Sequence, residues 1–283
     1  MRDEKEIFDL IMGMAESDER IRAVYMNGSR ADPSIEKDKY QDYDIVFVVT
    51  ETESFLADKN WIKVFGEIAF VQEPDSNELG WGIKHDYTKS YGWLMLFKDG
   101  NRIDLHIVTK AAALNEYLSD TLTVKLLDKD NILPEITASD KGYWIKPPTK
   151  ESYRGCCNEF WWCLNNVAKG IVRKQLPYAM RMYTEIVHVE LDRMIEWYIG
   201  MNHDFSVSTG MWGKFFEKYL PMELYAMYAK TYSGGDYDDM WAAIFAACGL
   251  FGFIAPKVGE CFNFAYSKNE ENNMMDYLNM VRG

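Results

Sequence analysis

The sequence predicts an α+β fold, in which an N-terminal mixed β-sheet with flanking helices is followed by an all-helical C-terminal domain. Two observations support this prediction. Short apolar runs of strand length, separated by turn residues, fill the first half of the chain. After Pro147-Pro148-Thr149, apolar residues recur at helical spacing instead. We therefore expect two domains, residues 1–146 and residues 147–283.

The elements of the first domain follow from local patterns. Helical spacing of apolar residues predicts an amphipathic helix over 3–16. The strand expected at 44–50 is apolar on both faces, which is typical of a central position in a sheet. Because Pro33 interrupts it, the helix expected around 31–38 is short. The other elements expected here are a helix starting within 51–61 and strands at 21–26, 69–72, 93–98 and 102–108, the last two joined by a turn at 99–101.

Apolar stripes predict long helices in the second domain. The first stripe comprises Tyr153, Cys157, Phe160, Leu164, Val167 and Ile171. The second comprises Met180, Thr184, Val187, Leu191 and Met194, and we expect Gly200 to end that helix. Further helices are expected over 215–230, 240–255 and 273–281. The stretch 240–255 is shorter than the roughly 20 apolar residues that a membrane span needs, so we expect a buried helix there.

Composition narrows the class of protein. The chain has 283 residues, 48% of them hydrophobic, which is enough for a substantial core. A formal charge of −13 argues against nucleic acid binding. It is compatible with a cationic partner, although many soluble cytosolic proteins are acidic and charge alone favours that explanation. Five cysteines without a C-x-x-C pair indicate reduced thiols, and the charged N-terminus shows no signal peptide pattern. We expect a cytoplasmic protein with no membrane partner, either a monomer or a homodimer.

A small-residue turn and a pair of carboxylates form the stretch that is most informative for function. Gly28-Ser29 follows the first predicted strand, where the N–H groups of a turn can contact phosphate oxygens. Asp42 and Asp44 stand at the start of the second strand, on the same side, because strand side chains alternate between faces. Two such carboxylates can bind a hard divalent cation such as Mg²⁺.

Asp104 supplies a third carboxylate from a later strand. If that strand lies beside the Asp44 strand, the three carboxylates converge and can bridge two Mg²⁺ ions, which suits in-line displacement at phosphorus. Asp104 can also take the proton of an attacking hydroxyl directly. Taken singly, Asp42 and Asp44 are equally explained as turn or capping residues, and Asp104 as an outward-facing strand residue. Their combination after a Gly-Ser turn favours a metal site.

These residues resemble a known family. Gly28-Ser29, Asp42-x-Asp44 and Asp104 match the signature of the nucleotidyltransferase superfamily typified by DNA polymerase beta. The sequence is further similar to the aminoglycoside 6-adenylyltransferases, also called streptomycin adenylyltransferases, over nearly the whole chain. The similar segments are 25–31 (YMNGSRA), 41–46 (QDYDIV), 102–105 (RIDL) and 160–169 (FWWCLNNVAK).

The resemblance implies a nucleotidyltransferase domain over 1–146 and a helical substrate-binding domain over 147–283. ATP would bind with Mg²⁺, a hydroxyl of streptomycin would attack the α-phosphorus, and AMP would be transferred as pyrophosphate leaves. Asp42, Asp44 and Asp104 would be metal ligands, with Asp104 also the candidate base. Ser29 and the N–H groups of the turn at Gly28 would hold the terminal phosphates. Arg30 would contact phosphate or, as a surface residue, pair with a nearby acid, and both interpretations stay open.

One face of the first C-terminal helix carries a second set of candidates. Spacing places Glu159, Trp162, Asn166, Lys169 and Arg173 on this face. Lys169 and Arg173 would neutralise triphosphate charge, while Glu159 and Trp162 would face the cationic drug. For Glu159 and Arg173 the same spacing is explained equally well by a charged helix face that is exposed to solvent. Most of the other acids of this domain are expected to be ordinary surface charge, and the sequence does not single out those that meet the drug. The candidate acids and aromatic walls are Glu185, Glu190, Asp192, Asp236, Asp238, Asp239, Trp81 and Trp93.

Two other functions remain open. The acceptor could be another small-molecule hydroxyl, such as that of a lincosamide. The chain could also be a non-catalytic nucleotide-binding protein, although the intact set of three acids argues against this.

Overall fold

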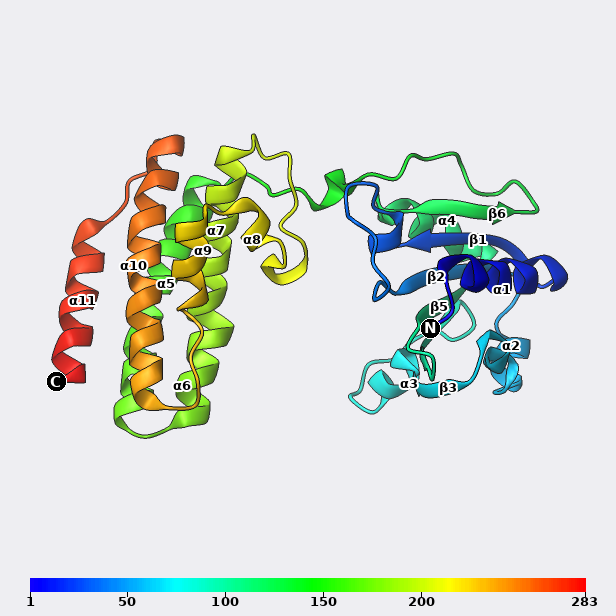
Figure 1. The fold of residues 1–283 in the computed structure, drawn as a ribbon, viewed down its shortest axis with the longest axis horizontal. Coiled ribbons are helices and arrows are strands. Elements are labelled where there is room, and N and C mark those ends of the chain that lie inside the picture. Colours follow the sequence, from blue (N-terminus) through cyan, green and yellow to red (C-terminus); the bar gives the residue numbers. More distant parts are fainter. The chain divides into compact units, whose positions relative to one another are not determined.

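The computed structural model describes residues 1–283 and divides into two compact units, Met1–Gly142 and Tyr143–Gly283. Figure 1 shows sheet and helices together in the first unit and only helices in the second. The predicted α+β fold, a mixed sheet followed by a helical region, is confirmed.

The first unit is built on one six-stranded sheet with the strand order β3-β4-β5-β2-β1-β6. Only β2 and β5 pair in parallel, and the other neighbours are antiparallel. The β2 strand is central, as its apolar faces predict. The strands are β1 (Ile21–Asn27), β2 (Tyr43–Val49), β3 (Ile68–Gln72), β4 (Ser90–Phe97), β5 (Arg102–Thr109) and β6 (Val124–Asp128).

Each face of the sheet has its own core. Ile45 and Phe47 point into the larger cluster, which is packed under α1 (Glu4–Ser17) and the 3-10 segment Trp61–Phe65. Val46 and Val48 point into a smaller cluster with residues of α4 (Lys110–Ser119). Because side chains alternate along β2, Asp44 shares the α4 side of the sheet with Val46.

Local chemistry explains where the first unit departs from the predictions. The helix expected around 31–38 is absent, and only a 3-10 turn, Ser29–Ala31, forms. Pro33 lacks an N–H, and the Asp32 carboxylate accepts hydrogen bonds from the backbone N–H and hydroxyl of Ser34, which stabilises a turn instead. The helices after β2 and β3 are short, namely α2 (Glu53–Ala57) and α3 (Pro74–Leu79). The strand β6 was not predicted.

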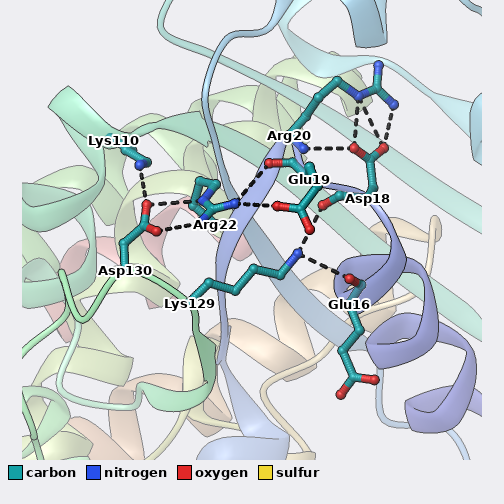
Figure 2. Close-up of polar contacts among 8 residues, drawn as sticks. All are labelled: Glu16, Asp18, Glu19, Arg20, Arg22, Lys110, Lys129 and Asp130. Carbon is teal, nitrogen blue, oxygen red and sulfur yellow. Dashed lines mark hydrogen bonds and ion pairs between the residues drawn. The ribbon is translucent and has the colours of Figure 1, made fainter.

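An ion-pair network ties β6 to the start of β1, as Figure 2 shows. Arg22 pairs with Glu19 at 2.7 Å and also with Asp130, which Lys110 contacts in turn. Lys129 donates to the backbone carbonyls of Glu16 and Asp18. Because Arg22 is mostly shielded from solvent, the network holds the end of β6 and the start of α4 against β1.

The second unit is a helical bundle around one core. Phe160 and Phe251 stack at a centroid distance of 3.8 Å, which joins the two longest helices. Figure 1 shows α5, α7 and α10 running side by side, with α11 at the outer edge. The helices are α5 (Lys150–Val172), α6 (Leu176–Met182), α7 (His188–Asn202), α8 (Phe216–Tyr219), α9 (Met222–Ala229), α10 (Tyr237–Phe262) and α11 (Lys268–Arg282).

Two helix predictions need correction. The second long helix is interrupted by a π-helical segment, Tyr183–Val187, and it continues past Gly200 to Asn202. The stretch 215–230 is two helices rather than one, because Pro221 cannot donate the hydrogen bond that would continue the first of them.

The apolar helix α10 is a core helix of the bundle. It is long and apolar enough to cross a membrane by length and composition alone, but 56% of its most apolar window is buried inside the protein. Its buried residues, such as Ile244 and Phe251, belong to the main hydrophobic cluster. The expectation of a buried helix at 240–255 is confirmed.

Candidate active site

The turn after β1 needs a glycine for two reasons. Gly28 has φ 75° and ψ −157°, a conformation that residues with a Cβ rarely adopt. A Cβ at this position would lie only 2.2 Å from Oδ2 of Asp44. The backbone of the turn therefore lies directly against the Asp44 carboxylate. The 3-10 turn that follows starts at Ser29, and its first N–H groups have no acceptor within the turn.

Asp44 and Asp104 lie side by side at the start of the two parallel strands. They are register partners in the β2–β5 pair. Asp42 comes just before β2, and its charge is close enough to act on the pKa of Asp44. Burial and, to a smaller extent, the negative charges of Asp104 and Asp42 together raise the pKa of Asp44 to about 6. The three acids predicted to converge are thus close enough to repel one another.

Arg102 lies among these acids. Its Nε and Nη2 donate to the two oxygens of Asp104 at 2.7 and 2.6 Å. Its Nη1 lies 3.3 Å from Oδ2 of Asp42. Burial raises the pKa of Asp42, although the charge of Arg102 opposes this. One guanidinium therefore compensates two of the three carboxylates.

The donor chemistry of these acids fits Mg²⁺. As the side chains stand, no group of three or more His, Cys, Asp or Glu residues is arranged so that it could hold a metal ion. However, Asp42, Asp44 and Asp104 offer only carboxylate oxygens, which are the ligands that hard divalent cations prefer. Burial and the neighbouring carboxylates both raise the pKa of Asp44, and a bound cation would offset the cost of keeping this carboxylate ionised.

Arg30 braces the segment that carries Asp42. Its buried guanidinium stacks on the Tyr43 ring at 3.8 Å and donates to the carbonyls of Gln41 and Asp42 at 2.8 and 3.1 Å. Because Arg30 is buried, the predicted surface position is wrong. The predicted pairing with an acid is present, since Arg30 pairs with Glu4. Arg30 also lines a cavity of about 330 Å³, whose other basic residues are Arg2, Lys37 and Lys39. A phosphate contact by Arg30 stays a prediction.

In the second unit, Trp162 and Lys169 line a cavity of about 550 Å³ between α5 and α11. Trp162 is 64% exposed and so is available for stacking. Glu159 and Arg173 do not line this cavity: Glu159 accepts a hydrogen bond from the Cys163 thiol, and Arg173 follows the last residue of α5. The single helix face predicted from spacing is therefore divided.

The family model described as "Streptomycin adenylyltransferase" matches residues 1–281. The chain belongs to this family. It is 37% identical to the aminoglycoside 6-adenylyltransferase of Staphylococcus aureus, with 96% of each chain covered. It is 37% identical to that of Campylobacter jejuni, covering 96% of this chain and 93% of the relative. For Bacillus subtilis (strain 168) the identity is 35%, with 96% and 95% covered.

A crystal structure of an aminoglycoside 6-adenyltransferase from Bacillus subtilis is also similar. The sequence identity is 30%, the match covers 100% of this chain and 99% of that one, and the TM-score is 0.48.

Several of the candidate acids for drug binding have partners within the second unit. Glu190 is buried and pairs with Arg193 at 2.6 Å. Asp192 accepts a hydrogen bond from the Tyr228 hydroxyl at 2.9 Å. Asp236 caps the start of α10. A contact between any of these three carboxylates and the drug stays a prediction. Trp93, expected as a wall, is a buried core residue, whereas Trp81 is 75% exposed.

Sequence reasoning missed two sets of residues in this streptomycin adenylyltransferase family member. No role was predicted for Arg102, because nothing in the linear sequence shows that its side chain folds back onto Asp104. The α11 side of the cavity was also missed. Its signal was weak, since Met274 and Tyr277 are apolar among the α11 residues that line the cavity, whereas Glu270 and Asn273 are polar.

Proposed function

We propose that this protein transfers AMP from ATP to a hydroxyl of an aminoglycoside, with streptomycin as the acceptor, and releases pyrophosphate, which inactivates the antibiotic. Membership of the streptomycin adenylyltransferase family supports this proposal, as do relatives named aminoglycoside 6-adenylyltransferase that match along 96% of the chain. The family's reaction also supports ATP as the co-substrate.

One structural observation carries the proposal. The Gly28 turn lies against the Asp44 carboxylate, and Asp44 and Asp104 are register partners on parallel strands. A turn suited to phosphate oxygens and acids suited to a divalent cation therefore meet at one edge of the sheet. This juxtaposition is what transfer of a nucleotidyl group requires.

In this proposal the turn and the acids have separate roles. The Ser29 hydroxyl and the N–H groups of the turn hold the terminal phosphates of ATP. Asp42, Asp44 and Asp104 would hold Mg²⁺, which when bound supplies charge neutralisation at phosphorus and at the departing pyrophosphate. Asp104 accepts the proton of the attacking hydroxyl. Arg30 keeps Asp42 in position through its two bonds to backbone carbonyls.

The second unit would supply contacts to both substrates. Lys169 and Arg173 neutralise triphosphate charge, and Trp162 with Glu159 forms part of the wall that meets the drug. Trp162 and Lys169 line the cavity, whereas Glu159 and Arg173 do not. A role in substrate binding is therefore better supported for Trp162 and Lys169. A net charge of −13 favours a cationic acceptor, and we propose a cytoplasmic enzyme.

A panel of acceptors tests the function. Purified protein is incubated with ATP, Mg²⁺ and one acceptor at a time, and pyrophosphate release is followed. The panel contains streptomycin, a second aminoglycoside, a lincosamide and no acceptor. Pyrophosphate release with streptomycin above the no-acceptor rate is the expected result. Release with the lincosamide alone would change the acceptor class, and ATP binding without release would favour a non-catalytic protein.

A further inference from the structure

Arg102 is placed where a cation for the active-site acids would have to bind. Its guanidinium contacts both oxygens of Asp104 on β5 and approaches Asp42, which directly precedes β2, so it spans two acids from different segments. Arg102 and Asp104 are both on β5, two residues apart, and therefore project from the same face of the strand. The contact is thus set by strand geometry rather than by a flexible loop.

The guanidinium and Mg²⁺ would compete for these acids. Mg²⁺ binds oxygens at about 2.0 to 2.1 Å, so an ion held by Asp42 and Asp104 would lie within a few Å of the guanidinium. Two cations at that separation repel each other, and the guanidinium already uses both Asp104 oxygens. Tight binding of Mg²⁺ therefore requires Arg102 to move away from Asp104.

Arg102 is free to make this movement. Its side chain is 42% exposed, whereas that of Asp104 is 17% exposed. Rotation of the arginine into solvent would leave no buried cavity, and its charge stays hydrated. The acids, by contrast, are fixed by the strands that carry them.

We propose that Arg102 is a positioning residue that takes the place of Mg²⁺ between Asp42 and Asp104 in the nucleotide-free enzyme and gives it up when ATP brings the metal. This inference rests on the metal site of the proposed function. Its consequence is that Mg²⁺ binds weakly to the protein alone and tightly only together with ATP. Without the arginine, the acids would bind Mg²⁺ before the nucleotide arrives.

Titration calorimetry of the full chain with Mg²⁺, in the absence of nucleotide, tests the proposal. In Arg102→Gln the dissociation constant for Mg²⁺ should fall on the order of tenfold or more, the factor expected when one nearby like charge is removed. Arg102→Lys keeps the charge and should stay near wild type. Adding a non-hydrolysable ATP analogue should strengthen Mg²⁺ binding markedly in wild type and only slightly in Arg102→Gln.

Arg22→Gln is the matched control. Arg22 also bridges two acids, Glu19 and Asp130 (Figure 2). It lies at the start of β1, whereas Gly28 follows the last residue of that strand. Its removal should leave Mg²⁺ binding unchanged. The proposal is overturned if Arg102→Gln binds Mg²⁺ no more tightly than wild type, or if Arg22→Gln gains as much affinity. AMP transfer to streptomycin by wild type decides the proposed function separately, whichever result the titration gives.

Discussion

Replacing Asp44 with asparagine should stabilise the metal-free protein while abolishing catalysis. The pKa of Asp44 is raised from its ordinary value of 3.8 to about 6 by burial and by the charges of Asp104 and Asp42. Such a rise means that folding opposes ionisation of this carboxyl. The asparagine side chain has nearly the same shape and carries no charge, so it removes the opposing term.

The sign and size of the effect follow from linkage. Below pH 3.8 Asp44 is protonated in both the folded and the unfolded protein, so it does not affect stability. Between pH 3.8 and about 6 the unfolded chain loses its proton first, and stability falls. Above pH 6 the full cost of holding an ionised Asp44 applies, about 3 kcal/mol for this difference in pKa.

Urea denaturation in EDTA, from pH 4 to pH 8, measures this cost. Asp44→Asn should exceed wild type by about 2 to 3 kcal/mol at pH 8, and the difference should vanish near pH 4. Asp99→Asn is the control, and for this variant we expect the opposite change in stability. Burial acts to raise the pKa of Asp99, but hydrogen bonds from Arg2 and Asn101 outweigh it and lower the pKa, so this variant should lose stability at pH 8. A less stable Asp44→Asn at pH 8 would refute the reasoning.

Three further substitutions test other parts of the site. Gly28→Ala should lower stability by about 2 kcal/mol or more and weaken ATP binding, because residue 28 has a positive φ and an alanine Cβ would clash with Asp44. An ATP affinity equal to that of wild type, measured by calorimetry, would contradict this. Arg30→Lys should cost about 1 to 2 kcal/mol of stability and lower kcat, because lysine lacks the planar fork that stacks on Tyr43; unchanged denaturation and rate would count against the bracing role. Lys169→Ala should raise KM for ATP roughly fivefold with little change in that for streptomycin, and the reverse pattern would assign Lys169 to the drug.

The sheet of the first unit was largely predictable because its strands are encoded locally. The apolar faces of Ile45–Val49 predict a central strand, and β2 is the central, parallel-paired strand. The turn at Asp99-Gly100-Asn101 predicts the β4–β5 hairpin, which forms. By contrast, β6 is half-buried along its whole length and has no strong apolar alternation, so its pairing with β1 depends on the tertiary fold.

The acids of the site were predictable because side-chain period and strand order determine where they lie. Their partners were not. Arg30 is buried because the ring of Tyr43 and carbonyls of the following loop surround it, and no local pattern encodes that. Arg102 reaches Asp42 only after β5 has paired beside β2. Arg173 continues the spacing of the helix face, but α5 ends one residue before it. The partners of these arginines therefore depend on contacts between segments that are distant in the sequence, and periodicity alone does not predict them.

Transfer of labelled AMP by the Asp104→Asn variant tests the central claim most directly. Wild type and variant, matched for folding by circular dichroism, are incubated with Mg²⁺, streptomycin and ATP labelled at the α-phosphate. We predict that label enters streptomycin with wild type and that Asp104→Asn reduces the rate by at least about a hundredfold, since a base and a metal ligand are lost together. Transfer by the variant at the wild-type rate would contradict the assignment of the three carboxylates as the catalytic site.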